Sequence, residues 1–249
     1  MEQQVKKETA KKDSTLIEEM FGVGAHFGYS KSRRHPSAKP IMFGVKNNVE
    51  IIDLEKTSEY LSRALEFVFS LGKEGKQILF VGGKSEAHET IVAGATSIGM
   101  PYAATRWVGG TITNFSEIKK RIDHLEDLMQ KKEKGEFAMY TKKERLMIDR
   151  EIEGLEKKFL GLLLMKQLPA ALFIIDSKKE KMAVAETKDA GIPIVSLLNS
   201  DCNMKEVDYP IPANDASHAS IKFFVDRIVS AYKKGKASQP EPAITVDEK

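Results

Sequence analysis

The sequence contains a single cysteine, Cys202, among its 249 residues. One thiol excludes a disulfide within the chain and a zinc site built on cysteines, and it is typical of a reducing, cytoplasmic compartment. Long hydrophobic runs are also lacking, because no stretch approaches the roughly 18 apolar residues that a membrane span needs. The first twenty residues carry charges where a secretory peptide would have its apolar stretch. We therefore expect neither a membrane protein nor an exported one.

Motifs of nucleotide binding and catalysis are incomplete. The run ILFVGGKS, Ile78–Ser85, joins a predicted strand to a glycine turn of the kind that presents backbone N–H groups to phosphate. The Walker pattern needs another glycine where Ile78 stands, so the turn is either a tight strand-to-helix connection or one whose Lys84 contacts some other phosphate. In GVGAHFG, residues 22–28, Phe27 replaces the third glycine of a dinucleotide loop. No nucleophile elbow is present, and we expect no catalytic residue and no cofactor.

Metal-ligating patterns are equally weak. The five histidines include no pair at the spacing of a zinc-binding helix. Asp176, Asp201 and Asp208 follow predicted strands, at the edge where open α/β sheets bind ligands. A weak metal or small-molecule site there and a structural role in capping helices and turns both remain open, and we assign no metal ligand.

Short apolar runs alternate with segments of helical periodicity over most of the chain. The predicted strands are Val49–Leu54, Ile78–Val81, Tyr102–Thr105, Ala171–Ile175 and Ile194–Leu198, and the predicted helices are Ser58–Leu71, Ser85–Ile98, Glu180–Ala190 and Asn214–Tyr232. This alternation predicts an α/β domain over residues 14–235, with a mostly parallel sheet and helices on both faces. A short helix is expected to open it, from Ser14 through about Phe21. Residues 1–13 and 236–249 are polar and are expected to be disordered tails.

A segment of different character, residues 116–165, interrupts the alternation. Its apolar residues recur at steps of three and four on either side of a polar turn near residues 134–140, as in paired helices. They are Ile118, Ile122, Leu125 and Met129 before the turn, and Ile148, Ile152, Leu155, Phe159 and Leu162 after it. We predict an inserted antiparallel coiled-coil hairpin. Two interpretations stay open: a solvated helix pair with no further role, or an arm that docks a partner.

Positive charge is concentrated in HFGYSKSRRHPSAKP, His26–Pro40, although the whole chain carries only +3. This basic segment contains no carboxylate; its cations are Lys31, Arg33, Arg34 and Lys39, and its planar side chains are His26, Tyr29 and His35. Two prolines and Gly28 predict an exposed, stiffened loop rather than a helix. Arginine binds phosphate bidentately, and basic segments with planar groups suit irregular RNA. We favour phosphate contact over a solvated charge run.

A second candidate is TRWVGGTITN, residues 105–114, where Arg106 precedes the only tryptophan, Trp107. The two side chains are suited to a cation–π pair or to a stacking platform for a base. The alternative makes Trp107 a core residue beneath the base of the predicted hairpin. The two interpretations are compatible.

Six ordered blocks resemble the successive motifs of the bacterial ribosomal protein S2 family. They are AHFGYSKSRRHPSAKPIMFG, NNVEIIDLEKT, ILFVGGKSEA, RWVGGTITNF, LPAALFIIDSKKEKMAVAETKDAGIPIVSLLNSDCN and DYPIPANDAS. The resemblance covers residues 14–235 and implies a flavodoxin-like (Rossmann-like) sheet with an inserted coiled-coil hairpin. It also implies a non-enzymatic constituent of the small ribosomal subunit that binds small-subunit ribosomal RNA. Such a protein lies between head and body and helps to dock ribosomal protein S1.

The resemblance extends to single residues. The HFG…RR…P block would place His26, Lys31, Arg33, Arg34 and Lys39 in or beside the RNA-facing region, and the RWxGG block would place Arg106 and Trp107 near it. The pattern is not matched at Tyr29 or at His35–Pro36, which favours phosphate contact over base stacking. His35 and Lys84 complete the candidate set.

The expected partners are ribosomal RNA and neighbouring ribosomal proteins, with no membrane and no homo-oligomer. Two alternatives to a ribosomal RNA-binding protein remain open. One is a protein–protein adaptor that acts through the hairpin. The other is a nucleotide-binding protein on the same fold, because a fold alone does not decide function.

Overall fold

The computed structural model describes residues 15–238 of the chain. Within them, five parallel strands form the central sheet in the order β5-β4-β6-β7-β8. The strands are β4 (Ile78–Val81), β5 (Tyr102–Ala103), β6 (Ala171–Ile175), β7 (Ile194–Leu198) and β8 (Tyr209–Pro212). Numbered along the chain, this order is 2-1-3-4-5, the order of flavodoxin-like folds. The predicted α/β class and parallel sheet are confirmed.

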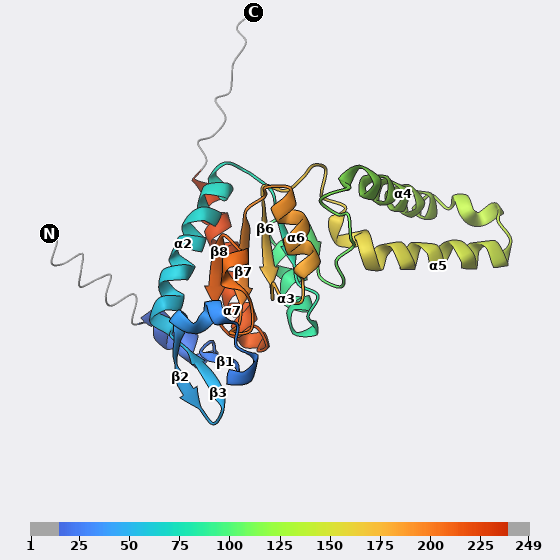
Figure 1. The fold of residues 1–249 in the computed structure, drawn as a ribbon. Helices are drawn as coiled ribbons and strands as arrows, with labels where there is room; N and C mark the ends of the chain where they lie inside the picture. The colour runs from blue at the N-terminus through green and yellow to red at the C-terminus, as the bar shows by residue number, and fades with distance from the viewer. Residues whose placement is uncertain (1–14, 239–249) are drawn as a thin grey trace, which may run out of the picture.

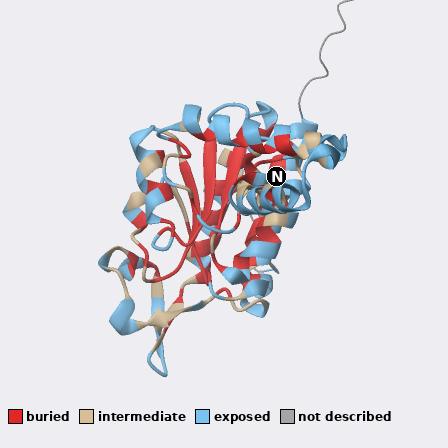
Figure 2. Cartoon of the chain, turned by 90° about the vertical axis from the view of Figure 1, so that its right-hand side faces the viewer, coloured by how far each residue is buried: buried red, intermediate tan, exposed pale blue. Residues whose placement is uncertain are grey.

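Helices cover both faces of this sheet (Figure 1). They are α2 (Leu54–Lys73), α3 (Ser85–Thr96) and α7 (His218–Ala237) on one face, and α6 (Lys181–Asp189) on the other. Phe80 and Phe173 pack toward the first group, whereas Leu79 and Leu172 pack toward α6 and the hairpin base. Because both faces are covered, β4, β6 and β7 are buried at every position (Figure 2).

A second, smaller sheet is antiparallel and has the order β1-β3-β2. Its strands are β1 (Phe27–Ser30), β2 (Met42–Lys46) and β3 (Val49–Ile52). The predicted strand Val49–Leu54 therefore exists only as far as Ile52, and it lies outside the parallel sheet. Asn47 and Asn48 both have positive φ and form the tight turn between β2 and β3, which pairs the two strands locally.

The predicted hairpin segment contains α4 (Phe115–Glu133) and α5 (Lys142–Phe159), which lie side by side and project from the sheet domain (Figure 1). The two helices are joined by an ion pair from Lys132 Nζ to Asp149 Oδ1 at 2.7 Å and by a hydrogen bond between His124 Nε2 and Glu151 Oε1 at 3.2 Å. The buried side chains are Ile118, Ile122, Leu125, Leu128, Ile152 and Phe159. Leu128 is buried where Met129 was expected. The helix pair is present, and its supercoiling as a coiled coil stays a prediction.

Several helices begin or end at residues other than those predicted from the sequence. Residues 15–22 are helical, as predicted for the short opening helix, although Ser14 lies outside the described residues. The C-terminal helix α7 begins at His218, not Asn214, and continues to Ala237, beyond the expected start of the tail. The expected tail over residues 1–13 and most of the C-terminal one lie outside residues 15–238. No helix in the described part of the chain is long and apolar enough to cross a bilayer.

Candidate nucleic-acid interface

The basic segment is more ordered than the predicted loop. It contains β1 and two 3-10 turns, Lys31–Arg33 and Pro36–Ile41. Pro36 stands at the first position of the second turn, where its missing N–H costs no hydrogen bond. His35 caps this turn, because its Nδ1 lies 3.2 Å from the Ser37 backbone N that donates to it. The segment is thus a short strand followed by two 3-10 turns, where a stiffened loop without helix was predicted.

The four cations of the segment differ in their surroundings. Lys31, Arg33 and Lys39 are exposed, and none of them forms an ion pair with a described residue. Arg34 is half-buried, and its Nη1 lies 2.9 Å from Oε1 of Glu50, a fully buried residue of β3. No carboxylate occurs within the segment itself, but folding brings that of Glu50 against Arg34. Arg34 is therefore neutralised by the fold, and the other three cations of the segment stay exposed.

The planar side chains of the segment are partly engaged within the protein. The His26 ring stacks on Phe21, with centroids 4.4 Å apart, and lies 4.0 Å from the Phe27 ring. Burial lowers the pKa of His26, which favours the neutral ring. The Tyr29 ring lies beneath the Arg33 guanidinium, 5.8 Å from its centre. These contacts leave phosphate binding by cations as the better supported chemistry.

Lys84 lies in a charged centre at the carboxyl edge of the parallel sheet. Val81 of β4 is in register with Ile174 of β6, so the residues that follow these strands meet at one edge. The Lys84 Nζ lies 2.8 Å from Oδ2 of Asp176 and 2.7 Å from Oδ2 of Asp215. Burial alone would lower the pKa of Lys84, but the two carboxylates outweigh it and raise that pKa. Lys84 is therefore a buried, charged ammonium.

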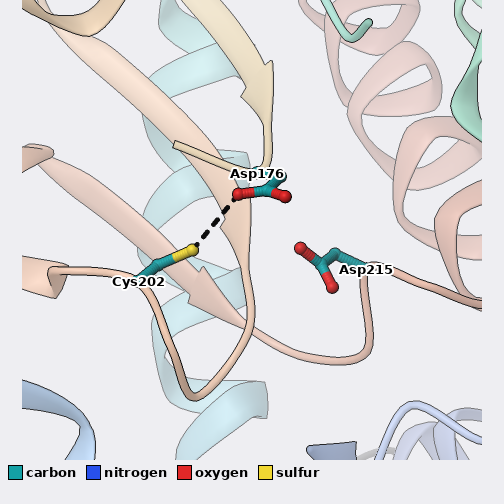
Figure 3. A group of neighbouring side chains, drawn as sticks. All are labelled: Asp176, Cys202 and Asp215. Carbon is teal, nitrogen blue, oxygen red and sulfur yellow. Dashed lines mark hydrogen bonds between the residues drawn. The ribbon is translucent and has the colours of Figure 1, made fainter. Parts of the chain in front are cut away.

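Figure 3 shows Asp176 and Asp215 beside the thiol of Cys202. The potential ligand atoms of these three residues all lie within 4.8 Å of one another. Burial raises the pKa of the Cys202 thiol to about 12, which leaves the thiol protonated in this centre. The positive charge between the carboxylates comes from Lys84. The arrangement is that of an internal ion-pair centre.

Of the aspartates singled out in the sequence, Asp176 and Asp201 both lie near the Cys202 Sγ, at 3.5 and 3.7 Å, whereas Asp208 lies apart from them. Asp176 accepts hydrogen bonds from the backbone N of Lys178 and of Lys179, at 3.1 and 3.0 Å. Asp201 pairs with the Lys178 amine at 2.9 Å, and Asp208 accepts from the backbone N of Ile194 at 2.9 Å. Each of the three thus has a structural role.

The glycine turn after β4 is occupied by the protein itself. The backbone N of Gly83 donates to Oε1 of Glu180 over 3.0 Å. A Cβ at Gly83 would lie 2.4 Å from the Thr105 carbonyl oxygen, so only glycine fits there. The N–H group that a phosphate would contact is already bound to a carboxylate, which argues against the nucleotide-binding alternative.

The RWVGG loop is organised by a second carboxylate, Glu186 of α6. Its Oε1 accepts from the Trp107 indole N at 3.1 Å and from the Gly110 backbone N at 2.8 Å, and its Oε2 accepts from the Ile112 backbone N at 3.1 Å. Burial opposes ionisation of Glu186, but these donors outweigh it and lower its pKa. Trp107 is a core residue, only 7% exposed, whereas Arg106 is exposed. The core interpretation of Trp107 fits this geometry.

Sequence reasoning missed the carboxylates that bind the basic segment, the glycine turn, the RWVGG loop and Lys84. Glu50, Glu180, Glu186 and Asp215 come from segments distant in sequence from the groups they bind. Asp215 follows β8, which was not predicted because YPIP contains two prolines. Proline is tolerated there because β8 is an edge strand. An aspartate after an unrecognised strand carried no signal of its position.

Comparison with known proteins agrees with the fold and with the motifs. The profile of the family described as Ribosomal protein S2 matches residues 20–235. Three relatives carry the name small ribosomal subunit protein uS2. That of Wolinella succinogenes is 42% identical over 221 residues, covering 89% of this chain and 82% of the relative. That of Chlorobium luteolum is 41% identical over 231 residues (93% and 91%), and that of Helicobacter acinonychis is 40% identical over 232 residues (93% and 94%). The chain belongs to the Ribosomal protein S2 family.

Proposed function

We propose that this chain binds small-subunit ribosomal RNA through the exposed cations of its basic segment. Membership of the S2 family makes it a structural constituent of the small ribosomal subunit rather than an enzyme, acting in the bacterial cytoplasm. The observation that carries the proposal is the exposure of Lys31, Arg33 and Lys39 without a carboxylate partner among the described residues. Exposed Arg106 is a further candidate contact.

The physical basis is the release of counterions from RNA. Each phosphate that a lysine or arginine neutralises displaces condensed cations, so affinity falls as salt rises. The fold supports this role because β1 and the two short turns hold the backbone of the segment. The conformational entropy lost on binding is therefore smaller than for a flexible basic tail.

The test measures binding of the purified chain to small-subunit ribosomal RNA over a range of salt concentrations. We expect Arg33→Ala to flatten the log–log salt slope by roughly 0.7 to 0.9, the value of one phosphate contact. Arg63→Ala is the matched control, because Arg63 is also exposed and lies 5.8 Å from a tyrosine ring, that of Tyr60. Equal slopes in all three proteins would contradict the proposal.

The proposal includes contacts with neighbouring ribosomal proteins, S1 among them. The 3-10 turn Glu136–Met139 and the start of α5 lie at the end of the hairpin far from the sheet (Figure 1). Met139 there is 92% accessible, and Leu146 and Met147 are also exposed. Exposed methionine and leucine side chains favour contact with a protein rather than with RNA. This observation supports the adaptor role as a second function of the same chain.

A polar triple variant, Met139→Ser with Leu146→Ser and Met147→Ser, separates this role from RNA binding. We expect it to weaken binding of purified S1 while leaving the salt slope for ribosomal RNA unchanged. Unchanged S1 binding would exclude the hairpin end as the S1 contact.

A calorimetric titration with ATP, GTP and NAD tests the nucleotide alternative, and micromolar binding of any of them would revive it.

A further inference from the structure

Lys84 lies beneath the basic segment rather than on the surface. The residue is only 9% exposed, and its Nζ contacts two carboxylates. The same Nζ lies 3.5 Å from the hydroxyl oxygen of Tyr29, a residue of β1. An ammonium held in this way has little freedom to reach an RNA phosphate. It is well placed, however, to determine where Tyr29 lies.

Hydrogen bonds connect this centre to the segment along a second route. Oδ1 of Asp215 accepts from the Asn199 side-chain amide at 3.1 Å, and Oδ1 of Asn199 accepts from the Ser200 backbone N at 2.7 Å. Ser200 in turn receives two N–H groups of the segment. Its Oγ accepts from the Tyr29 backbone N at 3.0 Å, and its carbonyl oxygen accepts from the His35 backbone N at 2.9 Å.

The contacts through Tyr29 and through Ser200 both affect where Arg33 lies. The Arg33 guanidinium lies over the Tyr29 ring, and Arg33 stands between the two residues whose N–H groups bind Ser200. Packing leaves β1 little room to shift, since a Cβ at Gly28 would lie 3.1 Å from the Glu50 carbonyl oxygen and 3.3 Å from Ser200 Oγ. The position of the main candidate phosphate contact therefore depends on the buried centre.

We propose that Lys84 is a positioning residue for RNA binding, which fixes Tyr29 and Ser200 from below and thereby orients the basic segment. The inference rests on the proposed function, and it replaces direct phosphate contact by Lys84 with an indirect role. The cation at the sheet edge, where folds of this order bind a ligand, serves instead to attach the segment to the sheet.

The first test needs no RNA. Lys84→Met combined with Asp215→Asn removes one charge of each sign, so the net charge of the centre stays the same. Amide hydrogen exchange of Tyr29 and His35 should become faster by about tenfold, as expected when hydrogen bonds that depend on a charged group weaken. Exchange in β6 should not change. The control is Lys131→Met, which removes an ion pair with Asp127 whose two side chains are both exposed.

Tyr29→Phe covers the case in which the double variant does not fold. It keeps the ring beneath Arg33 and removes only the hydroxyl, and exchange of the Tyr29 amide should again become faster. Unchanged exchange at both amides in a folded Lys84 variant would overturn the proposal. So would an unchanged Tyr29 amide in Tyr29→Phe.

The second test is a double-mutant cycle on RNA affinity. If Lys84 acts through the segment, the Lys84→Met/Asp215→Asn pair and Arg33→Ala should be non-additive, with the combined protein losing little more affinity than Arg33→Ala alone. Additive losses would mean that Lys84 contacts RNA independently, which would overturn the proposal. Absence of RNA binding by the parent protein would refute the proposed function instead, while the exchange experiment would still decide whether Lys84 orders the segment.

Discussion

At the scale of single residues, Arg33 and Arg34 are neighbours with different roles. Arg33 is exposed over a tyrosine ring, whereas Arg34 is bound to the buried carboxylate of Glu50. The second oxygen of Glu50, Oε2, is buried and has no hydrogen-bond partner among the described residues. The sequence shows two adjacent arginines as equivalent, because Glu50 is 16 positions away and enters the site only when β3 pairs with β1.

Loss of Arg34 should therefore destabilise the fold. Arg34→Ala leaves the Glu50 carboxylate buried without its cation. Breaking a buried pair costs roughly 3–5 kcal/mol, and because Arg34 is 26% exposed we expect a smaller loss in the free energy of unfolding, about 2 kcal/mol. Urea unfolding measures it. Arg33→Ala is the control and should stay within about 0.5 kcal/mol of the parent, and equal stability of the two variants would refute the distinction.

At the scale of elements, the most buried strands were the most predictable. The bounds of β4, β6 and β7 agree with the sequence prediction residue for residue, because strands buried on both faces are continuous apolar runs. The strands β1 and β2, which are as long as the predicted ones, were missed because they are partly exposed and neither shows a continuous apolar run. The candidate segment was found from its charge, but its attachment to Ser200 depends on contacts between residues about 170 positions apart.

The crossing of α2 and α7 supplies a prediction at this scale. A Cβ at Gly235 of α7 would lie 2.2 Å from the Phe69 carbonyl oxygen of α2. Backbone cannot yield as a flexible side chain does, so Gly235→Ala should separate the two helices and cost about 1–3 kcal/mol.

The matched control is Gly154→Ala in α5, where a Cβ would meet nothing within 4 Å. Alanine is the better helix former by about 1 kcal/mol, so this variant should be slightly more stable than the parent. The midpoint of thermal unfolding, followed by circular dichroism, should thus fall in Gly235→Ala and rise in Gly154→Ala. A lowered midpoint in Gly154→Ala, or an unchanged one in Gly235→Ala, would contradict the packing described.

At the scale of the whole molecule, the ligand edge of a flavodoxin-like sheet is filled by the chain's own charges. Lys84 provides the cation between Asp176 and Asp215, and Glu180 binds the N–H of the glycine turn. The basic segment then covers this edge through Tyr29 and Ser200. An architecture that elsewhere holds a small ligand thus provides a rigid base for a surface that we propose binds RNA.

This buried centre predicts how stability depends on pH. Burial raises the pKa of Cys202 from 9.0 to about 12, and the carboxylates raise that of Lys84 above its usual value of 10.5. In the unfolded chain the thiol loses its proton above pH 9.0, while the folded chain still holds it. The folded state then binds more protons, so stability falls as pH rises. The loss from Cys202 should be about 1.4 kcal/mol per pH unit between pH 9 and 12, and Lys84 adds a loss of the same sign above pH 10.5.

Denaturant unfolding of the parent and of Cys202→Ala at a series of pH values isolates the contribution of Cys202. The variant should be less stable than the parent at pH 8, because it loses a buried side chain, and the difference should shrink as pH rises above 9. Above pH 10.5 the variant should still lose stability, because Lys84 keeps its proton longer in the folded chain, as do Tyr29 and Tyr232, whose pKa values burial raises above 10.0. A difference between parent and variant that stays constant from pH 8 to 11 would mean that Cys202 ionises as readily in the folded protein as in the unfolded one. In that case the thiol beside Asp176 would lie in a far more polar, solvated centre than its burial implies.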